Sequence, residues 1–340
     1  MLPTLHERFP LRDCNTFGVE ARARWFCRAS AAEELAALAA EPRLAGLPRL
    51  VLGGGSNLLL TGDFDGLVIK VEVPGLRELG EAGGAWHVEV GAGENWHATV
   101  ERLLALRRPG LENLALIPGN CGAAPIQNIG AYGLELAERL DSLTAWDIDS
   151  QRLVQMSAAE CDFGYRDSVF KHALAGRRVI LSLRLALPKQ WQPVAAYADV
   201  AQELKARHVA DPQPRDLFDA VVAIRRRKLP DPAVIGNAGS FFKNPIVSRE
   251  QHRALIGHHP SLVGYPLPGG RVKLAAAWLI DAAGLKGVTR GRAGVYEKQA
   301  LVLVNRGGAT GAEILALARE VQDKVAEKFG IRLEPEPVIV

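Results

Sequence analysis

The sequence predicts an α+β protein with more than one domain, and three observations lead to this fold class. The chain has 340 residues, enough for about two or three domains at ~100–200 residues each. Short segments rich in Val, Ile and Leu alternate with amphipathic segments that begin at capping residues. The 34 glycines and 20 prolines favour many turns over long helical bundles.

The first third of the chain alternates helices and strands. A helix is expected in 30–41, where Ser30 and Glu33 have the spacing of a capping box. The Val/Ile content and the glycine punctuation of the following residues predict further elements. They are strand–loop–strand at 47–61, a strand at 65–73, and strand, turn and helix at 85–107.

The middle of the chain is less regular. Residues 109–140 are apolar but show little periodicity, and a long irregular stretch inside a compact domain is usually functional or disordered. Strands are expected at 140–148 and 178–187, with a second capping box, Ser157 to Glu160, between them. A proline-rich composition shift over 188–235 indicates a domain junction near 229.

The last part of the chain predicts two helices and two strands. Residues 271–287 form a helix that Gly284 ends, and 299–305 form a strand. Thr310 and Glu313 make a third capping box, which opens a helix that ends at Gly330. Its apolar residues at 314, 317, 321 and 325 share one face, and a final strand leads to the C-terminus.

Composition narrows the class of protein. The formal net charge is +3, which gives no nucleic-acid footprint. The four cysteines form no C-x-x-C pair and the histidines form no H-E-x-x-H, so we expect reduced thiols and no metal site. No apolar run reaches the ~18 residues of a membrane span and the N-terminus has no signal core. A soluble, cytoplasmic protein that binds neither nucleic acid nor membrane is expected.

Two glycine-rich loops raise the question of a phosphate or cofactor site. GGGSN (53–57) and GAGENW (91–96) both follow strands, but Leu58 and Trp96 stand where a dinucleotide fingerprint needs its third glycine. Each loop alone is more often a tight turn. Together with the irregular 109–133 segment they favour a large cofactor bound by many backbone groups.

Ser240 lies in GNAGSFFKNP (236–245), which resembles a hydrolase nucleophile loop at first sight. Ala238 and Phe242 flank it where G-x-S-x-G needs glycines, and no histidine is near in sequence. Ser240 could instead donate a proton to a charged intermediate, or be a loop serine before two core phenylalanines.

Several charged residues elsewhere in the chain also allow two interpretations, one functional and one structural. Arg166 in FGYRDSVFK could clamp a carboxylate or phosphate, or pair with Asp167. The basic run 225–228 could bind a diphosphate or be a solvated face. Glu334 and Glu336 would share one face of a strand, or be exposed at a fraying end.

Ten segments in order give the chain a family resemblance from about residue 15 to 336. They are NTFG, GGGSN, VGAGENWHATV, GLENLALIPGNCGAAPIQNIGAYG, CDFGYRDSVFK, KLPDP, GNAGSFFKNP, KLAAAWLID, QALVLVN and LEPE. The chain resembles the UDP-N-acetylenolpyruvoylglucosamine reductases, flavoenzymes of bacterial peptidoglycan precursor synthesis. The intact GYRDSVFK, Tyr197 and Tyr265 resemble the longer subclass, which has a tyrosine-bearing substrate loop.

The resemblance implies a fold of three parts. A two-subdomain FAD-binding domain of the vanillyl-alcohol-oxidase type is followed by a C-terminal α/β substrate-binding domain. We expect subdomain 1 at 1–74 with 338–340, subdomain 2 at 75–229, and the substrate domain at 230–337. This fold binds FAD without G-x-G-x-x-G, in keeping with the failed fingerprint, and in the family the 109–133 segment lines the flavin.

The resemblance also implies a reaction. FAD takes a hydride from NADPH and passes it to carbon 3 of the enolpyruvyl group of UDP-N-acetylglucosamine enolpyruvate, and a proton reaches carbon 2 to give UDP-N-acetylmuramate. By motif match Ser240 is the proton donor, and Arg166 and Glu336 polarise the substrate carboxylate. Because a bare carboxylate would repel the developing charge, we expect burial to raise the pKa of Glu336.

Binding residues carry over by the same matches, and a monomer is expected. The residues implied to bind FAD are Gly53, Gly54, Gly55, Ser56, Asn57, Gly119, Asn120, Gly122, Ala123, Gln127, Asn128, Gly130 and Tyr132. Those implied to bind the substrate are Tyr165, Tyr197, Arg225, Lys228, Asn244, Tyr265, Lys273 and Gln299. Departures are Ala123 and Ala124, where some members have hydroxyl residues, and Val338, where some have arginine.

Two other functions are weighed against this one. The first is a sibling FAD oxidase that reacts with oxygen and a sugar, which the set of serine, arginine and glutamate disfavours. The second is a flavin- or nucleotide-binding protein without catalysis. Flavin colour and substrate-dependent NADPH consumption separate the three.

Overall fold

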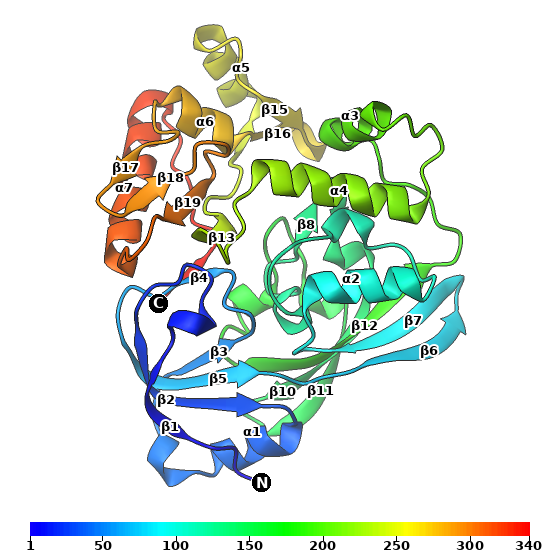
Figure 1. Ribbon diagram of the computed structural model, residues 1–340, viewed down its shortest axis with the longest axis vertical. Helices are drawn as coiled ribbons and strands as arrows, with labels where there is room; N and C mark the ends of the chain where they lie inside the picture. The colour runs from blue at the N-terminus through cyan, green and yellow to red at the C-terminus, as the bar shows by residue number, and fades with distance from the viewer. The chain divides into compact units, whose positions relative to one another are not determined.

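The computed structural model describes residues 1–340, which divide into two units of mixed helices and strands (Figure 1). The N-terminal unit consists of Met1–Phe9, Ala23–Gly55 and Phe64–Arg227. The C-terminal unit consists of Pro10–Arg22, Ser56–Asp63 and Lys228–Val340. The α+β class predicted from the sequence is confirmed in both units.

Two sheets form the frame of the N-terminal unit. The four-stranded sheet has the order β1-β2-β5-β3, in which β5 pairs in parallel with β2 and β3. Its strands are β1 (His6–Pro10), β2 (Arg22–Ala29), β3 (Arg49–Leu52) and β5 (Phe64–Val71). The second sheet has the order β11-β10-β12-β7-β6 and is antiparallel throughout. Its strands are β6 (Leu76–Ala82), β7 (Ala85–Gly91), β10 (Leu140–Asp147), β11 (Arg152–Ser157) and β12 (Arg178–Pro188).

A β-bulge in β12, near Leu181, lets the five-stranded sheet serve two cores. Its register against β10 slips between Thr144 and Ala145, so the alternation of buried residues changes phase. On one side of the slip, Val179 and Leu181 join the core that α1 (Ala32–Ala39) covers. On the other side, Leu183, Leu185 and Leu187 join the core under α2 and α4 (Figure 1). The helices of this second core are α2 (Trp96–Ala105), α3 (Ala198–Ala206) and α4 (Pro214–Lys228).

Irregular segments carry much of the second core. Residues 109–140 contain only short elements, among them the 3-10 turn Glu112–Leu114 and the strand pair β8 (Gly130–Ala131) and β9 (Leu134–Glu135). Leu111, Leu114, Ile129 and Leu136 from this segment are nevertheless buried in the core of α2 and α4. The segment therefore has no long helix or strand, but its apolar side chains fix it to the core.

The C-terminal unit contains three short sheets and three helices. Its sheets have the orders β13-β19-β18-β17, β14-β16-β15 and β20-β4. The strands are β4 (Leu58–Leu59), β13 (Gly236–Ser240), β14 (Ile246–Ser248), β15 (Gly264–Pro266), β16 (Arg271–Leu274), β17 (Thr289–Arg290), β18 (Ala293–Val295), β19 (Val302–Asn305) and β20 (Val338–Ile339). The helices are α5 (Arg249–His258), α6 (Ala276–Ala282) and α7 (Gly311–Phe329).

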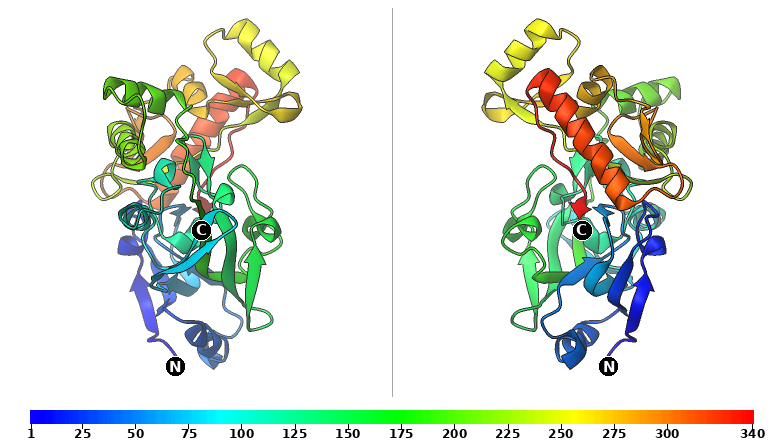
Figure 2. Two further views of the ribbon diagram at one scale, coloured as in Figure 1. Left: turned by 90° about the vertical axis from the view of Figure 1, so that its right-hand side faces the viewer. Right: turned by 90° about the vertical axis from the view of Figure 1, so that its left-hand side faces the viewer.

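Helix α7 anchors this unit, whereas α5 stands apart from its core. The apolar face predicted for α7, Ile314, Leu317, Val321 and Val325, is buried against β18, β19 and α6. Helix α5 buries none of its residues, and Figure 2 shows it projecting with β14, β15 and β16 from the rest of the unit.

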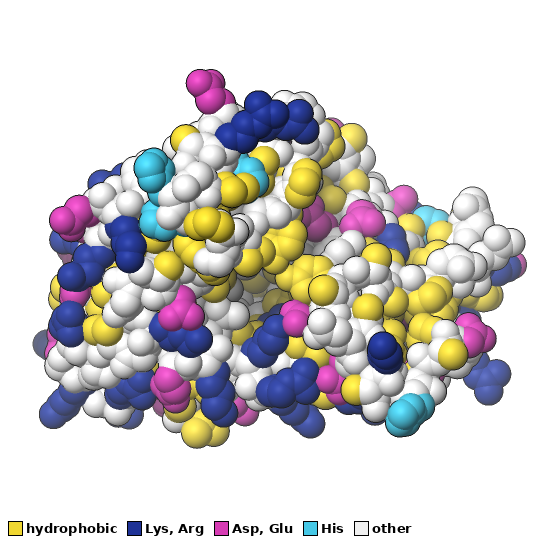
Figure 3. Space-filling view, turned by 90° about the horizontal axis from the view of Figure 1, so that it is seen from above, with side chains coloured by type: hydrophobic (Ala, Val, Ile, Leu, Met, Phe, Trp, Pro, Cys, Tyr) yellow, Lys and Arg dark blue, Asp and Glu magenta, His cyan; other side chains and the backbone are white.

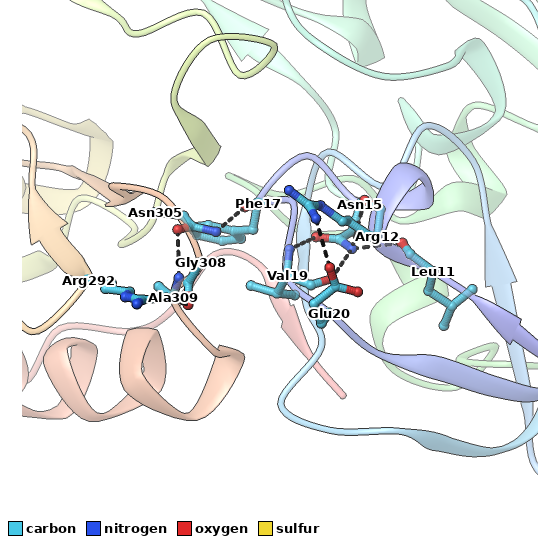
Figure 4. A network of polar contacts seen from close by, with 10 residues as sticks. All are labelled: Leu11, Arg12, Asn15, Phe17, Val19, Glu20, Arg292, Asn305, Gly308 and Ala309. Carbon is cyan, nitrogen blue, oxygen red and sulfur yellow. Dashed lines mark hydrogen bonds and ion pairs between the residues drawn. The ribbon is translucent and has the colours of Figure 1, made fainter.

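Two buried asparagines hold the loop 10–22 within the C-terminal unit, one by bonding it to the rest of the unit and one by bonding within it. Asn305 Nδ2 donates to the carbonyl oxygen of Phe17 at 2.9 Å, while Asn305 Oδ1 accepts from Ala309 N (Figure 4). Asn305 Oδ1 also accepts from Gly307 N. Asn15 Nδ2 donates to carbonyl oxygens on both sides of its own loop, which fixes the loop's shape. Because all of these groups are buried, losing either amide would leave several backbone groups unpaired.

The helix boundaries show where local signals hold and where they fail. Thr310 caps α7 with Glu313 as predicted, and Gly330 ends it at φ 66°. The box predicted for Ser30 and Glu33 is wrong, because Glu34 is the residue that accepts from the N–H groups of Ser30 and Ala31.

Three further expectations are met only in part. Ser157 and Glu160 do bond reciprocally, but they open only a 3-10 turn, Ala159–Cys161. The helix expected over 271–287 is shorter, since β16 takes its first four residues. The strand expected near the C-terminus is confined to β20.

The outer surface carries both signs of charge. In the view of Figure 3, Lys and Arg side chains occur around the whole face and lie among Asp and Glu. None of the helices combines the length and apolar character that crossing a membrane requires. No group of three or more His, Cys, Asp and Glu side chains is placed to hold a metal ion.

Candidate active site

The glycine-rich loop 91–96 and the segment 119–122 are bonded to each other along their backbones in the N-terminal unit. The bonds run from Trp96 N to the Gly119 oxygen (3.0 Å), from Cys121 N to the Glu94 oxygen (2.8 Å) and from Gly122 N to the Ala92 oxygen (2.9 Å). Asn120 adds a side-chain bond, from Nδ2 to the carbonyl oxygen of Gly93 at 2.9 Å. The two stretches that sequence analysis considered separately therefore form one platform.

The first glycine loop approaches the same platform too closely for any side chain. A Cβ on Gly54 would stand 2.8 Å from Gly119 Cα and 2.9 Å from Asn120 Oδ1, and one on Gly122 would stand 2.5 Å from Ala92 Cβ. Gly53 lies beside Ala123, and Gly119 has φ 114°. Glycine at these positions lets the backbone segments pack directly against one another, which fits a site built from main-chain groups.

Arg166 stands at the tip of a strained turn. Gly164 and Asp167 close the turn with two backbone hydrogen bonds, and Arg166 itself has φ 55°, a region that non-glycine residues rarely adopt. Its Nη2 donates to the carbonyl oxygen of Gly130 at 2.5 Å, and its guanidinium lies 5.3 Å from the ring centre of Tyr165. The turn thus aims Arg166 at the end of the 109–133 segment.

Asn128 joins this turn to the rest of the segment. Its Nδ2 donates to Glu135 Oε2 at 2.8 Å and to the carbonyl oxygen of Gly164 at 3.1 Å, and its Oδ1 accepts from Ala137 N at 2.9 Å. The side chain of Asn128 is buried and fully engaged within the protein. It orders the segment and the Arg166 turn together.

Arg225 and two tyrosines complete the polar group in this unit. The ring of Tyr132 meets the ring of Tyr197 edge-on, with centroids 5.4 Å apart, and its hydroxyl bonds to Arg225. Arg225 Nε is buried without a hydrogen-bond partner. Burial lowers the pKa of the Arg225 guanidinium and Arg166 lowers it further, while Tyr132 opposes both effects. Burial also raises the pKa of Tyr132.

In the C-terminal unit, Ser240 ends strand β13 beside β19. Ser240 pairs with Val302, and the register slips between Asn237 and Ser240, where Gly239 has φ 70°. The slip is held by Gly239 N donating to Asn237 Oδ1 at 2.9 Å. The next residue, Phe241, is wholly buried. Ser240 is therefore a partly buried serine at the bulged end of a strand, and the residue that follows it is held in the core.

Glu336 lies alongside this strand end. Its backbone N–H donates to the carbonyl oxygen of Phe241 at 2.8 Å, and the neighbouring Phe242 bridges to Pro335. Asn57 Nδ2 donates to the carbonyl oxygen of Glu336 at 3.4 Å. Val338 N donates to the backbone carbonyl oxygen of Asn57. The structure therefore brings predicted catalytic residues 240 and 336 and the last residue of GGGSN into one neighbourhood.

Glu334 and Glu336, in contrast, differ in their surroundings. Glu334 is exposed and lies 3.4 Å from Lys243 Nζ, whereas Glu336 is partly buried. The two-residue spacing of Glu334 and Glu336 therefore does not predict the burial of Glu336.

The remaining predicted substrate residues of this unit lie on several separate elements. Asn244 Oδ1 accepts from Ala276 N at the start of α6. Gln299 Oε1 accepts from Leu301 N, and the carbonyl oxygen of Leu301 in turn accepts from Phe241 N. Tyr265 and Lys273 are cross-strand partners on β15 and β16, and the Tyr265 side chain is 43% exposed. Lys228 is the last residue of α4, where the basic run 225–228 occupies the final helical turn.

Sequence reasoning missed two residues that order the site, Glu112 and Asn113. Both are buried and bond to segments distant in sequence, including the backbone next to the Tyr132 and Tyr197 rings. The only signal was the presence of two adjacent polar residues in an otherwise apolar stretch. Periodicity could not reveal it, because the segment has none.

Comparisons with known proteins identify the two domains and the family of the chain. Residues 231–340 match the model of the C-terminal domain of UDP-N-acetylenolpyruvoylglucosamine reductase, and residues 23–156 match an FAD binding domain. Such reductases of Paraburkholderia phymatum and Ralstonia nicotianae are similar to this chain. They are 58% identical over 332 residues (97% of this chain, 96% of the relative) and 56% identical over 340 residues (99% of each).

A solved structure gives the same fold. The UDP-N-acetylenolpyruvylglucosamine reductase of Thermus caldophilus is 24% identical, covers 100% of this chain and 99% of its own, and has a TM-score of 0.68. This similarity confirms the expected pairing of an FAD-binding domain with a C-terminal substrate-type domain. The chain belongs to the UDP-N-acetylenolpyruvoylglucosamine reductase family.

Proposed function

We propose that Arg166, Ser240 and Glu336 catalyse the reduction of UDP-N-acetylglucosamine enolpyruvate to UDP-N-acetylmuramate in this protein. Family membership makes the protein an FAD-dependent oxidoreductase of peptidoglycan precursor synthesis, with NADPH as the hydride donor. The buried Nε of Arg225, which has no hydrogen-bond partner and lies near the charge of Arg166, is the single observation that carries the proposal for Arg166.

The glycine platform suits FAD. When bound, FAD accepts a hydride from NADPH and supplies it to carbon 3 of the enolpyruvyl group. The residues proposed to hold it are Gly53, Gly54, Gly55, Ser56, Asn57, Gly119, Asn120, Gly122, Ala123, Gln127, Asn128, Gly130 and Tyr132. The close approach of Gly54 to Gly119 supports this assignment, because it brings the two glycine-rich backbone segments together with no side chain between them. Asn128 contributes by ordering the segment, since its own amide is already bonded within the protein.

Arg166 and Arg225 are suited to an anion. Burial and the nearby charge of Arg166 both disfavour the charged form of Arg225, so a negative group between the two guanidinium groups would relieve the cost. The enolpyruvyl carboxylate and the diphosphate of the substrate are both such groups. We assign Arg166 to the carboxylate, where a well-placed donor lowers a barrier by ~3–4 kcal/mol as charge develops. Arg225 supports it as a substrate-binding residue.

Ser240 donates the proton that reaches carbon 2. The bulge at Gly239 and the bonds of Phe241 fix its backbone, so its hydroxyl has a defined origin. A serine hydroxyl is a weak acid and therefore acts only on a strongly basic carbon next to it. Glu336 stabilises the charged intermediate if it is protonated or hydrogen-bonded, and a raised pKa for Glu336 stays a prediction.

The other assignments are extensions of the same proposal. Substrate binding is assigned to Tyr165, Tyr197, Lys228, Asn244, Tyr265, Lys273 and Gln299. We propose subdomain 1 at 1–74 with 338–340, subdomain 2 at 75–229 and the substrate domain at 230–337. We also propose a cytoplasmic monomer of the longer subclass that binds neither nucleic acid nor membrane.

The test of this function uses the purified full chain. We expect a yellow protein whose NADPH consumption depends on added UDP-N-acetylglucosamine enolpyruvate. A chain that stays colourless after incubation with FAD would contradict the cofactor assignment. NADPH consumption that proceeds with oxygen alone, and that the enolpyruvyl compound does not change, would favour the oxidase reading over the reductase.

A further inference from the structure

Glu112 and Asn113 are two adjacent polar residues sealed inside the N-terminal unit. They begin the 3-10 turn Glu112–Leu114, and their exposed fractions are only 2% and 1%. Polar side chains almost never occupy such places unless their hydrogen bonds are made. The partners of these two residues therefore show what they are for.

Asn113 joins two segments of backbone that are far apart in sequence. Its Nδ2 donates to the carbonyl oxygen of Tyr132 at 2.9 Å and to that of Val194 at 2.7 Å. Tyr132 has φ 48°, a conformation that a tyrosine needs outside help to keep. One amide group thus holds the end of the 109–133 segment and the approach to Tyr197 at a fixed separation.

Glu112 holds the same approach from a second point. Its Oε2 accepts from Trp191 Nε1 at 3.1 Å, while its Oε1 accepts from Gly110 N at 2.7 Å. Burial raises the pKa of Glu112, and the hydrogen bonds from Gly110 and Trp191 oppose that rise. The carboxylate therefore acts as a buried acceptor that ties the indole to the turn.

The residues that follow Trp191 need these bonds. Residues 191–196 belong to no helix or strand, and α3 begins only at Ala198. Tyr197 comes directly before α3 and is 41% exposed, and its ring packs edge-on against Tyr132. Its carbonyl oxygen accepts from Val200 N and Ala201 N, so α3 holds its backbone from the C-terminal side. The path of 191–196 holds the backbone from the N-terminal side, and Glu112 and Asn113 bond to that path and to Tyr132.

We propose that Glu112 and Asn113 are positioning residues that hold Tyr197 ready for the enolpyruvyl substrate. The proposal rests on the proposed function, in which Tyr197 binds that substrate. Glu112 fixes the start of the 191–196 segment through Trp191, and Asn113 fixes its middle through Val194. Asn113 also fixes Tyr132, the ring against which Tyr197 rests. Neither residue touches the reacting atoms.

The variant Trp191→Phe tests the proposal with little disturbance, because it removes the indole N–H and keeps an aromatic ring. We expect KM for the enolpyruvyl substrate to rise about tenfold, a factor that corresponds to ~1.4 kcal/mol. The rate of flavin reduction at saturating NADPH should stay as in the unmodified protein. Trp25→Phe is the matched control, since Trp25 lies on β2 in the other sheet of the same unit, where its ring contacts Arg43, and should leave KM unchanged.

A double-mutant cycle separates positioning from a general loss of stability. Tyr197→Ala should itself raise KM, and adding Trp191→Phe to it should raise KM no further, because the residue being positioned is gone. Asn113→Leu, if it folds, should behave like Trp191→Phe, with a larger effect.

The proposal is overturned if Trp191→Phe lowers only the melting temperature, or if it raises KM equally with and without Tyr197. It also fails if Tyr197→Ala leaves KM unchanged. Failure of the proposed function is a different result, since the unmodified protein would then consume NADPH without dependence on the enolpyruvyl substrate.

Discussion

The backbone N–H of Glu336 donates to the carbonyl oxygen of Phe241, 2.8 Å away, and Phe241 follows Ser240 directly. Residues almost a hundred positions apart are therefore fixed to each other through main-chain atoms, which do not depend on side-chain rotamers. Asn57 extends the arrangement, since its side-chain amide lies near the carbonyl oxygen of Glu336. The proposed proton donor, Ser240, and the proposed charge-stabilising residue, Glu336, can act on one substrate with little reorganisation when they are held in this way.

Ser240→Ala should therefore separate the two half-reactions. Flavin reduction by NADPH needs no proton from Ser240 and should proceed at its normal rate. Reoxidation by the enolpyruvyl substrate should slow by ~10²–10⁴-fold, the usual contribution of a positioned proton donor. Anaerobic stopped-flow measurement of flavin absorbance checks both steps.

Ser150→Ala serves as the control for Ser240→Ala. Ser150 is exposed in the turn between β10 and β11, and its substitution should leave both rates unchanged. An equal slowing of both half-reactions by Ser240→Ala would show that Ser240 supports the structure and gives no proton.

Gly54→Ala tests the glycine platform. The added Cβ would stand 2.8 Å from Gly119 Cα and 2.9 Å from Asn120 Oδ1, so backbone must move to admit it. We expect overpacking to destabilise the N-terminal unit by ~1–3 kcal/mol. The purified protein should also contain less FAD, measured as the ratio of flavin to protein absorbance.

The matched control for Gly54→Ala is Gly257→Ala in helix α5. A Cβ on Gly257 meets nothing within 4 Å, and alanine favours a helix, so FAD content should stay the same. A Gly54→Ala protein with full FAD content and an unchanged melting temperature would contradict the role proposed for the glycine platform.

Local signals predicted much of the fold, and long-range partnerships explain what they missed. Thr310 and Glu313 are three residues apart, so one sequence window contains the whole capping interaction. Ser30 failed for a local reason, because Glu33 and Glu34 both offer a carboxylate and one residue decides which reaches the helix start. Strands β6 and β11 were not expected, since their burial depends on sheet neighbours elsewhere in the chain.

The same distinction holds in the site. Ser240, Arg166 and Glu336 could be named because their motifs resemble a family, whereas composition and periodicity left each with two readings. Asn113 bonds to Val194, 81 positions away, and nothing near either residue announces the contact. Before the slip at Leu181 in β12, three consecutive residues, 179–181, are apolar, and after it leucines alternate with other residues. Such a run does not tell where the register against β10 slips, because that depends on the partner strand.

The cysteines should be inert in the folded protein. Burial raises the pKa of Cys27, Cys121 and Cys161 to about 12 each, and the thiols form no disulfide, as expected from the sequence. At pH 8 about one such thiol in ten thousand is the reactive thiolate. A thiol reagent should therefore label these positions very slowly in native protein and all four cysteines rapidly in denaturant. Rapid labelling of the native protein at any of the three would contradict the buried placement.

His97 should make the stability of the N-terminal unit depend on pH. Its Nδ1 accepts from Leu116 N at 3.1 Å, and its ring stacks on Phe218 at 5.5 Å. Burial lowers the pKa of His97, Arg225 and Arg226 add to the effect, and Glu101 opposes it. Leu116 has φ 58°, so the accepted bond supports a backbone conformation that leucine rarely adopts.

The sign follows from proton uptake by the two states. An unfolded histidine titrates near ~6.5, whereas folded His97 titrates lower, so between these values the unfolded state holds more protons. The free energy of unfolding should therefore fall as pH drops below about 6.5 and level off below the folded pKa. In the variant His97→Gln, which cannot titrate at this position, this part of the pH dependence should vanish.

Urea unfolding of both proteins at several pH values between about 5 and 8 measures the difference. The stability advantage of the unmodified protein over the His97→Gln variant should be greatest at the upper end, where a neutral ring accepts from Leu116. This advantage should shrink toward the lower end. If the difference in unfolding free energy between the two proteins is the same at every pH, His97 has the same pKa in the folded and unfolded states. That result would contradict a neutral His97 ring that accepts from Leu116 N.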